Sequence, residues 1–332
     1  MQHWSWLFAL AAMPACGCGS TAEPPDGGQP SSTTSASPGP TDSAAEGSTL
    51  ALASPFVKED LVDLGQRRVS RFAYVESTNT LFASFGDPPT LEGKPPPAEH
   101  ENEIEEWDLS AGRRRFVYSL PPSWMPDDVY PSPDGSLLGV LLYGKTAPAW
   151  CRVSVFDTTS HARVHSSACA FLDRHTKILY DAGSHFAIES RNAIENTAPP
   201  SFRTFDHAGH SVAIDAKQFA AKPNCPGCEE IEQVQGRNDH GLYFTDASGT
   251  RSLVEKNPEH GGFGLTNDGK WLVVATSNGE LVIWSTEARR EVSREKSTES
   301  NGHLVYDSMR DRFLFAVAAD SGSSLVRVLR RR

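Results

Sequence analysis

The chain has 332 residues, a formal net charge of −11 at pH 7 and a hydrophobic fraction of 38%. This length is enough for one sizeable domain and a tail, and the acidic balance argues against binding to nucleic acid. No apolar run approaches the roughly 18–20 residues that a membrane-spanning helix needs.

The first apolar segment runs from Trp4 to Ala15, and Cys16 and Cys18 follow it directly. A short apolar stretch that ends in small residues is typical of a secretory signal peptide. It resembles the signal of bacterial lipoproteins, in which a cysteine becomes the acylated N-terminus. This resemblance implies a signal within residues 1–18 and lipid attachment at Cys16, with Cys18 as the alternative. We therefore expect a lipid-anchored protein of the bacterial cell envelope, facing the periplasm or the cell exterior.

Residues 19–50 are rich in Pro, Gly, Ser, Thr and Ala and contain almost no large apolar side chain. Such a stretch cannot bury enough surface to offset its chain entropy, so we expect a disordered linker. It would tether the domain formed by residues 51–332 to the membrane.

Within that domain, a bulky residue that closes a short β-rich run and precedes a polar turn recurs about every 40–50 residues. The six closing residues are Trp107, Phe156, Phe205, Phe244, Trp284 and Leu329. A repeat of this length is typical of the blades of a β-propeller.

The most regular unit is Phe263 to Val292, which reads as four short strands with three turns. Asn267-Asp268-Gly269 and Ser277-Asn278-Gly279 supply residues that tolerate the positive φ of tight turns. The run between these turns, Lys270 to Thr276, is apolar on both faces, which predicts a strand buried on both sides. The unit is therefore predicted to be one four-stranded antiparallel blade.

The repeats resemble the WD-repeat and WD-like propeller family. Trp107-Asp108 matches the dipeptide of that family, and Phe156-Asp157 and Phe205-Asp206 match it with another aromatic residue. The turn Ser132-Pro133-Asp134-Gly135 matches a signature of bacterial WD-like propellers. The resemblance implies an all-β fold, and the repeats predict a six-bladed β-propeller.

The chain ends on a third strand, Leu325 to Leu329, so the last blade lacks an outer strand. We expect the alternating segment Phe56–Leu64 to supply it, which would close the ring without an open edge. In the third blade, strands are expected at Ala168–Leu172 and Lys177–Tyr180. A seventh blade is possible if the excursion between Tyr180 and Pro200 hides one.

The cysteines after the signal form an even set, which in an exported protein favours disulfides. The four candidates are Cys151, Cys169, Cys225 and Cys228. Pairing cannot be deduced from spacing alone, and we favour 151–169 with 225–228. A lone Cys-x-x-Cys without a second pair does not predict a zinc site.

Two histidine pairs have ligand-like spacing, His161 with His165 and His207 with His210. They fall in predicted turns between strands, where such spacing does not converge on a metal. The Arg113–Arg115 and Arg330–Arg332 tracts are expected to be a solvated turn and terminus. No nucleophile elbow or phosphate loop is present, so the sequence predicts no catalytic residues, metal or cofactor.

The leading functional hypothesis is a membrane-anchored scaffold that binds a protein or an envelope component and is not an enzyme. One alternative resembles the six-bladed propeller hydrolases or lactonases, which hold a metal in the central channel. Its candidate acidic residues near inner strands are Asp128, Asp173 and Glu230. Another alternative is a sensor or adhesin for small ligands or glycans.

Overall fold

The computed structural model describes most of the domain expected at residues 51–332. It covers residues 54–332 except 66, 68, 86–101, 145–150, 170–175, 184, 191–199, 220–230, 236–239, 247, 257–261, 277–278, 297–303 and 319–323. The expected signal peptide, Cys16, Cys18 and the linker lie outside the described residues, as do Cys225, Cys228, Asp173 and Glu230.

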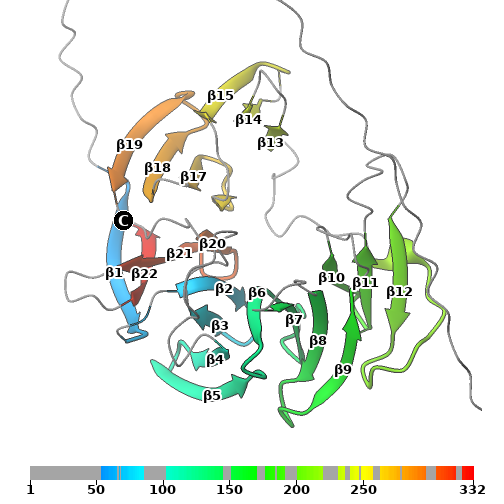
Figure 1. The fold of residues 1–332 in the computed structure, drawn as a ribbon. Coiled ribbons are helices and arrows are strands. Elements are labelled where there is room, and N and C mark those ends of the chain that lie inside the picture. The colour runs from blue at the N-terminus through cyan, green and yellow to red at the C-terminus, as the bar shows by residue number, and fades with distance from the viewer. Residues whose placement is uncertain are drawn as a thin grey trace, which may run out of the picture. The chain divides into compact units, whose positions relative to one another are not determined.

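The described residues fold almost entirely into antiparallel β-structure, as the sequence predicts. They form 22 strands and one short helix, η1 (Ala216–Phe219). Within this part of the chain no helix is long and apolar enough to span a membrane. The strands of the described residues group into six sheets (Figure 1). In five sheets the strands follow one another in the chain, and the sixth combines the first strand with the last three.

We number the six sheets in chain order. Sheet 1 contains β2 (Val69–Val75), β3 (Thr80–Phe85), β4 (Glu103–Asp108) and β5 (Arg113–Ser119). Sheet 2 contains β6 (Trp124–Pro131), β7 (Leu137–Gly144), β8 (Cys151–Asp157) and β9 (Arg163–Ala168). Sheet 3 contains β10 (Lys177–Tyr180), β11 (Phe186–Ser190) and β12 (Ser201–Phe205).

Sheet 4 contains β13 (Ile231–Gln235), β14 (His240–Thr245) and β15 (Arg251–Lys256). Sheet 5 contains β16 (Phe263–Leu265), β17 (Trp271–Ala275), β18 (Glu280–Ser285) and β19 (Arg290–Lys296). Sheet 6 contains β20 (Leu304–Asp307), β21 (Arg312–Ala318), β22 (Ser324–Arg331) and, from the start of the domain, β1 (Phe56–Asp63).

Strand β17 shows how neighbouring sheets pack. Val273 and Ala275 on one face join a buried cluster with side chains of sheet 6. Leu272 and Val274 on the other face join a cluster with sheet 4. The prediction of a strand that is apolar on both faces is therefore confirmed.

The same packing recurs between other sheets. Buried clusters join sheet 6 to sheet 1, sheet 1 to sheet 2, and sheet 2 to sheet 3. The connection from sheet 3 to sheet 4 includes residues 220–230, which lie outside the described part. Five pairs of neighbouring sheets therefore share a buried cluster: 1 with 2, 2 with 3, 4 with 5, 5 with 6, and 6 with 1.

The predicted pairing of the N-terminal strand with the last strand of the chain is confirmed. β1 pairs antiparallel with β22 from Phe56↔Arg331 to Asp63↔Leu325. The chain then crosses to sheet 1 through a segment that is held by backbone bonds. Leu64 N–H donates to the Ser324 carbonyl, and Ser324 N–H donates to the Gly65 carbonyl, each at 2.8 Å. The first and last described strands therefore belong to one sheet.

The prediction for the third blade was wrong. Ala168 ends β9, where it pairs with Arg152, so it belongs to the outer strand of sheet 2. Lys177–Tyr180 is the first strand of sheet 3, not the second. The second strand is β11, Phe186–Ser190, within the excursion where a seventh blade was considered. In the described residues this excursion therefore completes sheet 3.

Candidate functional site

The candidate site lies on the first strands of sheets 1 and 2. These strands, β2 and β6, lie against each other, and each begins its sheet (Figure 1). Four of their residues carry charge or a phenol and interact with one another: Arg71, Asp127, Asp128 and Tyr130. We call these four residues the inner-strand cluster.

Both strands carry a β-bulge at this level. The pairing of β6 with β7 shifts between Pro126 and Asp128, so Asp127 is the extra residue. The pairing of β2 with β3 shifts between Val69 and Arg71, so the extra residue there is Ser70. A bulge bends the strand and redirects side chains, and bulges are frequent next to active sites. The bulges therefore place polar residues on strands that otherwise read as buried.

The cluster has mixed electrostatics. Burial raises the pKa of the Asp127 carboxyl, the nearby Arg71 guanidinium lowers it, and the Asp128 charge raises it again. Burial also raises the pKa of Tyr130, and so does Asp128, which accepts a hydrogen bond from the phenol. Asp128 Oδ1 further accepts the Val129 N–H at 2.9 Å.

This arrangement combines several hydrogen-bonding functions in a small region. A carboxyl whose pKa is raised by burial is a common feature of functional sites. A guanidinium is a fixed donor and a carboxylate is an acceptor. The cluster can therefore bind hydroxyl groups through paired donors and acceptors.

The sequence analysis identified only part of this cluster. Asp128 lies on an inner strand, as predicted, whereas Asp173 and Glu230 lie outside the described residues. Arg71 and Asp127 were missed. The available signal was that each of these charged residues lies at the start of a short β-rich run. Among the residues that the structure covers, no three or more His, Cys, Asp or Glu side chains form a group that could hold a metal ion.

The prediction that both histidine pairs fall in turns between strands holds for three of the histidines and is wrong for His165. His161 lies in the turn after β8 and His165 lies on β9. His207 and His210 both follow β12, but their carboxylate partners differ. His207 lies 3.0 Å from Asp157, and His210 lies 3.2 Å from Asp206.

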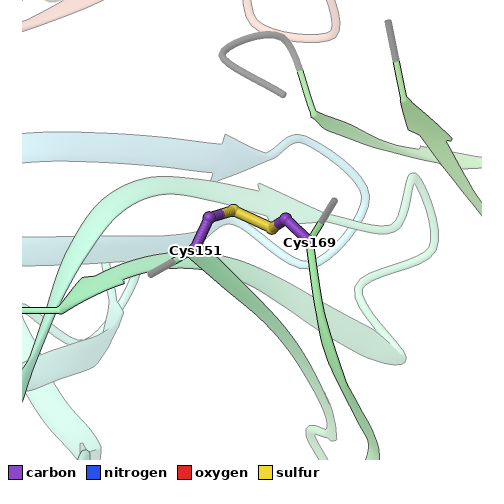
Figure 2. Close-up of a disulfide and its surroundings, with 2 residues drawn as sticks. All are labelled: Cys151 and Cys169. Atoms are coloured by element: carbon purple, nitrogen blue, oxygen red, sulfur yellow. A yellow bond between two sulfur atoms is a disulfide. The ribbon is translucent and has the colours of Figure 1, made fainter. Parts of the chain in front are cut away.

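Cys151 and Cys169 form a disulfide between the start of β8 and the residue after β9 (Figure 2). Their Cα atoms are 5.1 Å apart, and the Cys169 N–H donates to the Cys151 carbonyl at 2.9 Å. This is the pair favoured by the sequence. The other proposed pair, Cys225 with Cys228, lies outside the described residues.

A second polar group joins sheets 6 and 1 and is structural. Asp307 is fully buried and accepts hydrogen bonds from Arg312 at 2.7 Å and from Tyr74 at 2.8 Å. Arg312 also donates to Asn79 Oδ1 at 2.7 Å. Because these buried groups bond to one another, they hold two sheets together and leave no free group for a ligand.

The arginine tracts, which the sequence predicts to be a solvated turn and terminus, make ion pairs within the fold. Arg114 reaches Glu105, whose side chain is fully buried, at 2.5 Å. Arg331 pairs with Asp268 at 2.7 Å, which links sheet 6 to the first turn of sheet 5. Each tract thus contains an arginine that pairs with an acidic residue on another strand or sheet.

No protein-family model and no curated protein matches the chain. Similar solved structures include regucalcin, a calcium-binding protein from Agrobacterium tumefaciens, at 12% identity and a TM-score of 0.43 over 83% of this chain and 96% of that one. An oligogalacturonate lyase in complex with manganese is 11% identical, with a TM-score of 0.40, over 79% of this chain and 76% of that one. The oligogalacturonate lyase of Vibrio parahaemolyticus is 13% identical, with a TM-score of 0.39, over 78% and 76%.

Proposed function

We propose that residues 51–332 form a six-bladed propeller of the WD-like kind that binds a small hydroxyl-bearing ligand on its inner strands. Six successive antiparallel sheets, of which five neighbouring pairs share a buried cluster, support this architecture. The pairing of β1 with β22 supports a ring that closes within sheet 6. In a propeller the sheets surround a central channel.

The inner-strand cluster is the observation that carries the ligand-binding role. Arg71 and Asp127 come from different sheets, so a ligand that bonds to both would bridge two blades. Two carboxyls, one guanidinium and one phenol offer both donors and acceptors, which suits the hydroxyl groups of a sugar or polyol. One guanidinium against two carboxyls favours a neutral or weakly cationic ligand over an anion.

Binding of a panel of neutral sugars, amino sugars and sugar acids, measured by calorimetry, tests this role. We expect one or more neutral or amino sugars to bind, and Asp127→Asn and Arg71→Gln to weaken that binding at least about tenfold. Glu59→Gln, on the outer strand β1, is the matched control and should bind as the unaltered protein does. Equal affinity for all four proteins would reject the site.

We further propose that the domain is exported and held at the bacterial cell envelope by lipid on Cys16 or Cys18. The short apolar segment and the linker support this arrangement. Metabolic labelling with a fatty acid in a bacterial host tests it. Loss of label in Cys16→Ser but not in Cys18→Ser would assign Cys16, and the reverse would assign Cys18. Absence of label in the unaltered protein would reject lipid anchoring.

A second candidate function, binding of a protein partner, is favoured by the edge of sheet 3. In the described residues β12 is the last full strand of that sheet, and only Ser211 and Val212 pair along its outer edge. The Thr204 carbonyl faces this outer edge, because it accepts the Val212 N–H at 3.0 Å. Alternation along the strand gives Phe202 the same orientation, and among the described residues no strand pairs with it along this edge.

Crosslinking in envelope fractions tests partner binding. Phe202→Pro removes one outward N–H and should abolish capture of a partner, while Arg203→Ala, which keeps every backbone donor, should not. Capture that is unchanged in Phe202→Pro would reject strand addition as the mode of binding.

A further inference from the structure

We propose that Tyr180, on the first strand of sheet 3, is a positioning residue of the inner-strand cluster. Its hydroxyl holds the end of β6, so that Asp128 and Tyr130 keep the arrangement that binds the ligand. The inference rests on the proposed ligand-binding role and extends it, because it adds a third sheet to a site whose other residues come from sheets 1 and 2.

The Tyr180 hydroxyl makes a contact between sheets 3 and 2. It donates a hydrogen bond to the Tyr130 carbonyl at 2.8 Å, from a residue 50 positions further along the chain. Both side chains pack on the buried cluster that joins these two sheets. Strand β10, which carries Tyr180, lies against β7 of sheet 2 (Figure 1). The backbone of a cluster residue is therefore held by a side chain of the next sheet.

The lack of a side chain at Gly139 makes room for this contact. Gly139 pairs with Tyr130 across β6 and β7. A Cβ atom at Gly139 would lie 2.7 Å from the Tyr180 hydroxyl and 2.7 Å from Ile178 Cδ1. Both distances are well below an ordinary van der Waals contact, so even an alanine would displace one of these side chains. Sheet 2 is thus shaped to receive a phenol from sheet 3 beside Tyr130.

The hydrogen bonds continue from Tyr180 to the carboxylate of the cluster. Burial raises the pKa of Tyr180, a hydrogen bond with the Gly139 backbone lowers it, and the charge of Asp134 raises it again. The net shift is upwards, so the hydroxyl stays a donor at neutral pH. Tyr130 in turn donates from its own hydroxyl to Asp128. Two hydrogen bonds that share Tyr130 therefore connect sheet 3 to Asp128.

Tyr306 provides a matched control elsewhere in the fold. Like Tyr180, it lies on the first strand of its sheet, and its hydroxyl bonds to the preceding sheet. The hydroxyl accepts the Asn267 N–H at 2.7 Å and donates to Asp311 at 2.5 Å. None of these three residues belongs to the inner-strand cluster. Tyr306→Phe therefore removes a hydrogen bond between neighbouring sheets without touching the proposed site.

Calorimetric titration with the panel of neutral and amino sugars, beside a thermal melt of each protein, tests the role of Tyr180. We expect Tyr180→Phe, which keeps the ring and loses the hydroxyl, to bind about three- to tenfold more weakly than the unaltered protein. Tyr306→Phe should also melt at a lower temperature, yet bind with unchanged affinity, so lost stability cannot explain the difference. Unchanged affinity in Tyr180→Phe, or equal weakening in both variants, would overturn the proposal.

A measurement without ligand separates this proposal from the proposed function. If no sugar binds to the unaltered protein, the ligand-binding role fails, but nuclear magnetic resonance of tyrosine labelled with carbon-13 at Cζ still tests the positioning. Tyr130→Phe assigns the Tyr130 signal, and Asp128→Ala shows where it moves when the phenol loses its acceptor. We expect Tyr180→Phe to move the signal in the same direction and Tyr306→Phe to leave it in place. A Tyr130 signal unchanged in Tyr180→Phe would show that Tyr180 does not position Tyr130.

Discussion

Phe56, in the first described strand, and Phe313, in β21 near the end of the chain, meet edge to face with ring centroids 6.0 Å apart. Phe56 also meets Trp271 of sheet 5 edge to face at 6.2 Å. One residue at the start of the domain thus packs on both sheet 6 and sheet 5. Strand β1 is therefore held by side-chain packing as well as by its pairing with β22.

Phe56→Ala is expected to destabilise the domain by about 3–5 kcal/mol, because it removes a buried aromatic ring from this junction. Chemical denaturation measures the effect. Val57→Ala, on the same strand but 40% exposed, is the control and should cost well under half as much. A Phe56 variant as stable as the Val57 variant would contradict the role of β1 as an integral strand.

Glu105→Ala is expected to destabilise the domain by about 1–3 kcal/mol, since it removes a fully buried carboxylate from the partly buried Arg67 and the half-exposed Arg114. The Glu105 side chain is fully buried and receives Arg67 at 2.7 Å, Arg114 at 2.5 Å and the Trp107 indole at 2.9 Å. Denaturant titration checks this value. Glu103→Ala serves as the control, because its carboxylate is 4.0 Å from Arg67 and 26% exposed.

Tyr74 should make the domain sensitive to alkaline pH. Burial raises the pKa of Tyr74 to about 12, with Asp307 adding to the rise and Arg312 opposing it. The ordinary value is 10, so the stability that the neutral phenol contributes is complete below pH 10 and is lost as the pH rises towards 12.

Tyr74→Phe should therefore lose less stability between pH 10 and 12 than the unaltered protein does, although it starts about 1–2 kcal/mol lower at pH 7 because its partners lose a hydrogen bond. The free energy of unfolding is measured across this range, with absorbance titration of the tyrosines in parallel. These measurements separate the lost hydrogen bond, which lowers stability at pH 7, from the titration of the phenol, which lowers it above pH 10. Parallel stability curves for both proteins would show that Tyr74 titrates normally.

Removal of the disulfide in Cys151→Ala/Cys169→Ala should cost about 2–4 kcal/mol, since the bond closes a loop between residues 18 positions apart. Thermal melts with and without a reductant measure the loss. A reductant should destabilise the unaltered protein by a similar amount. Any further loss when the reductant is added to the double variant would indicate a second bond, between Cys225 and Cys228.

The fold of sheet 5 could be predicted because its turns are specified locally. Gly269 has a φ of 68°, and Asp268 accepts hydrogen bonds from Thr266 and from the Lys270 N–H within the same turn. A short stretch of sequence thus contains the residues that end one strand and begin the next. The predicted turn Ser132–Gly135 of sheet 2 is of the same kind, since Gly135 has a φ of 76°.

The candidate site could not be predicted in the same way, because its partners are distant in the chain. Arg71 and Asp127 are brought together by the packing of two sheets, and bulges set their positions. The network of Arg312 with Asn79 spans 233 residues. Local patterns carry no information on such pairs. Strand β11 was missed for another reason, because it is short and only partly apolar.

The central claim is that the inner-strand cluster binds a ligand, and the measurement that tests it most directly is calorimetric titration of the unaltered protein and of Asp127→Asn with a panel of sugars. The account predicts saturable binding of at least one neutral or amino sugar by the unaltered protein. It predicts an affinity at least about tenfold lower in the variant, with an unchanged melting profile. Binding of equal strength to both proteins, or no saturable binding to the folded unaltered protein, would contradict the account.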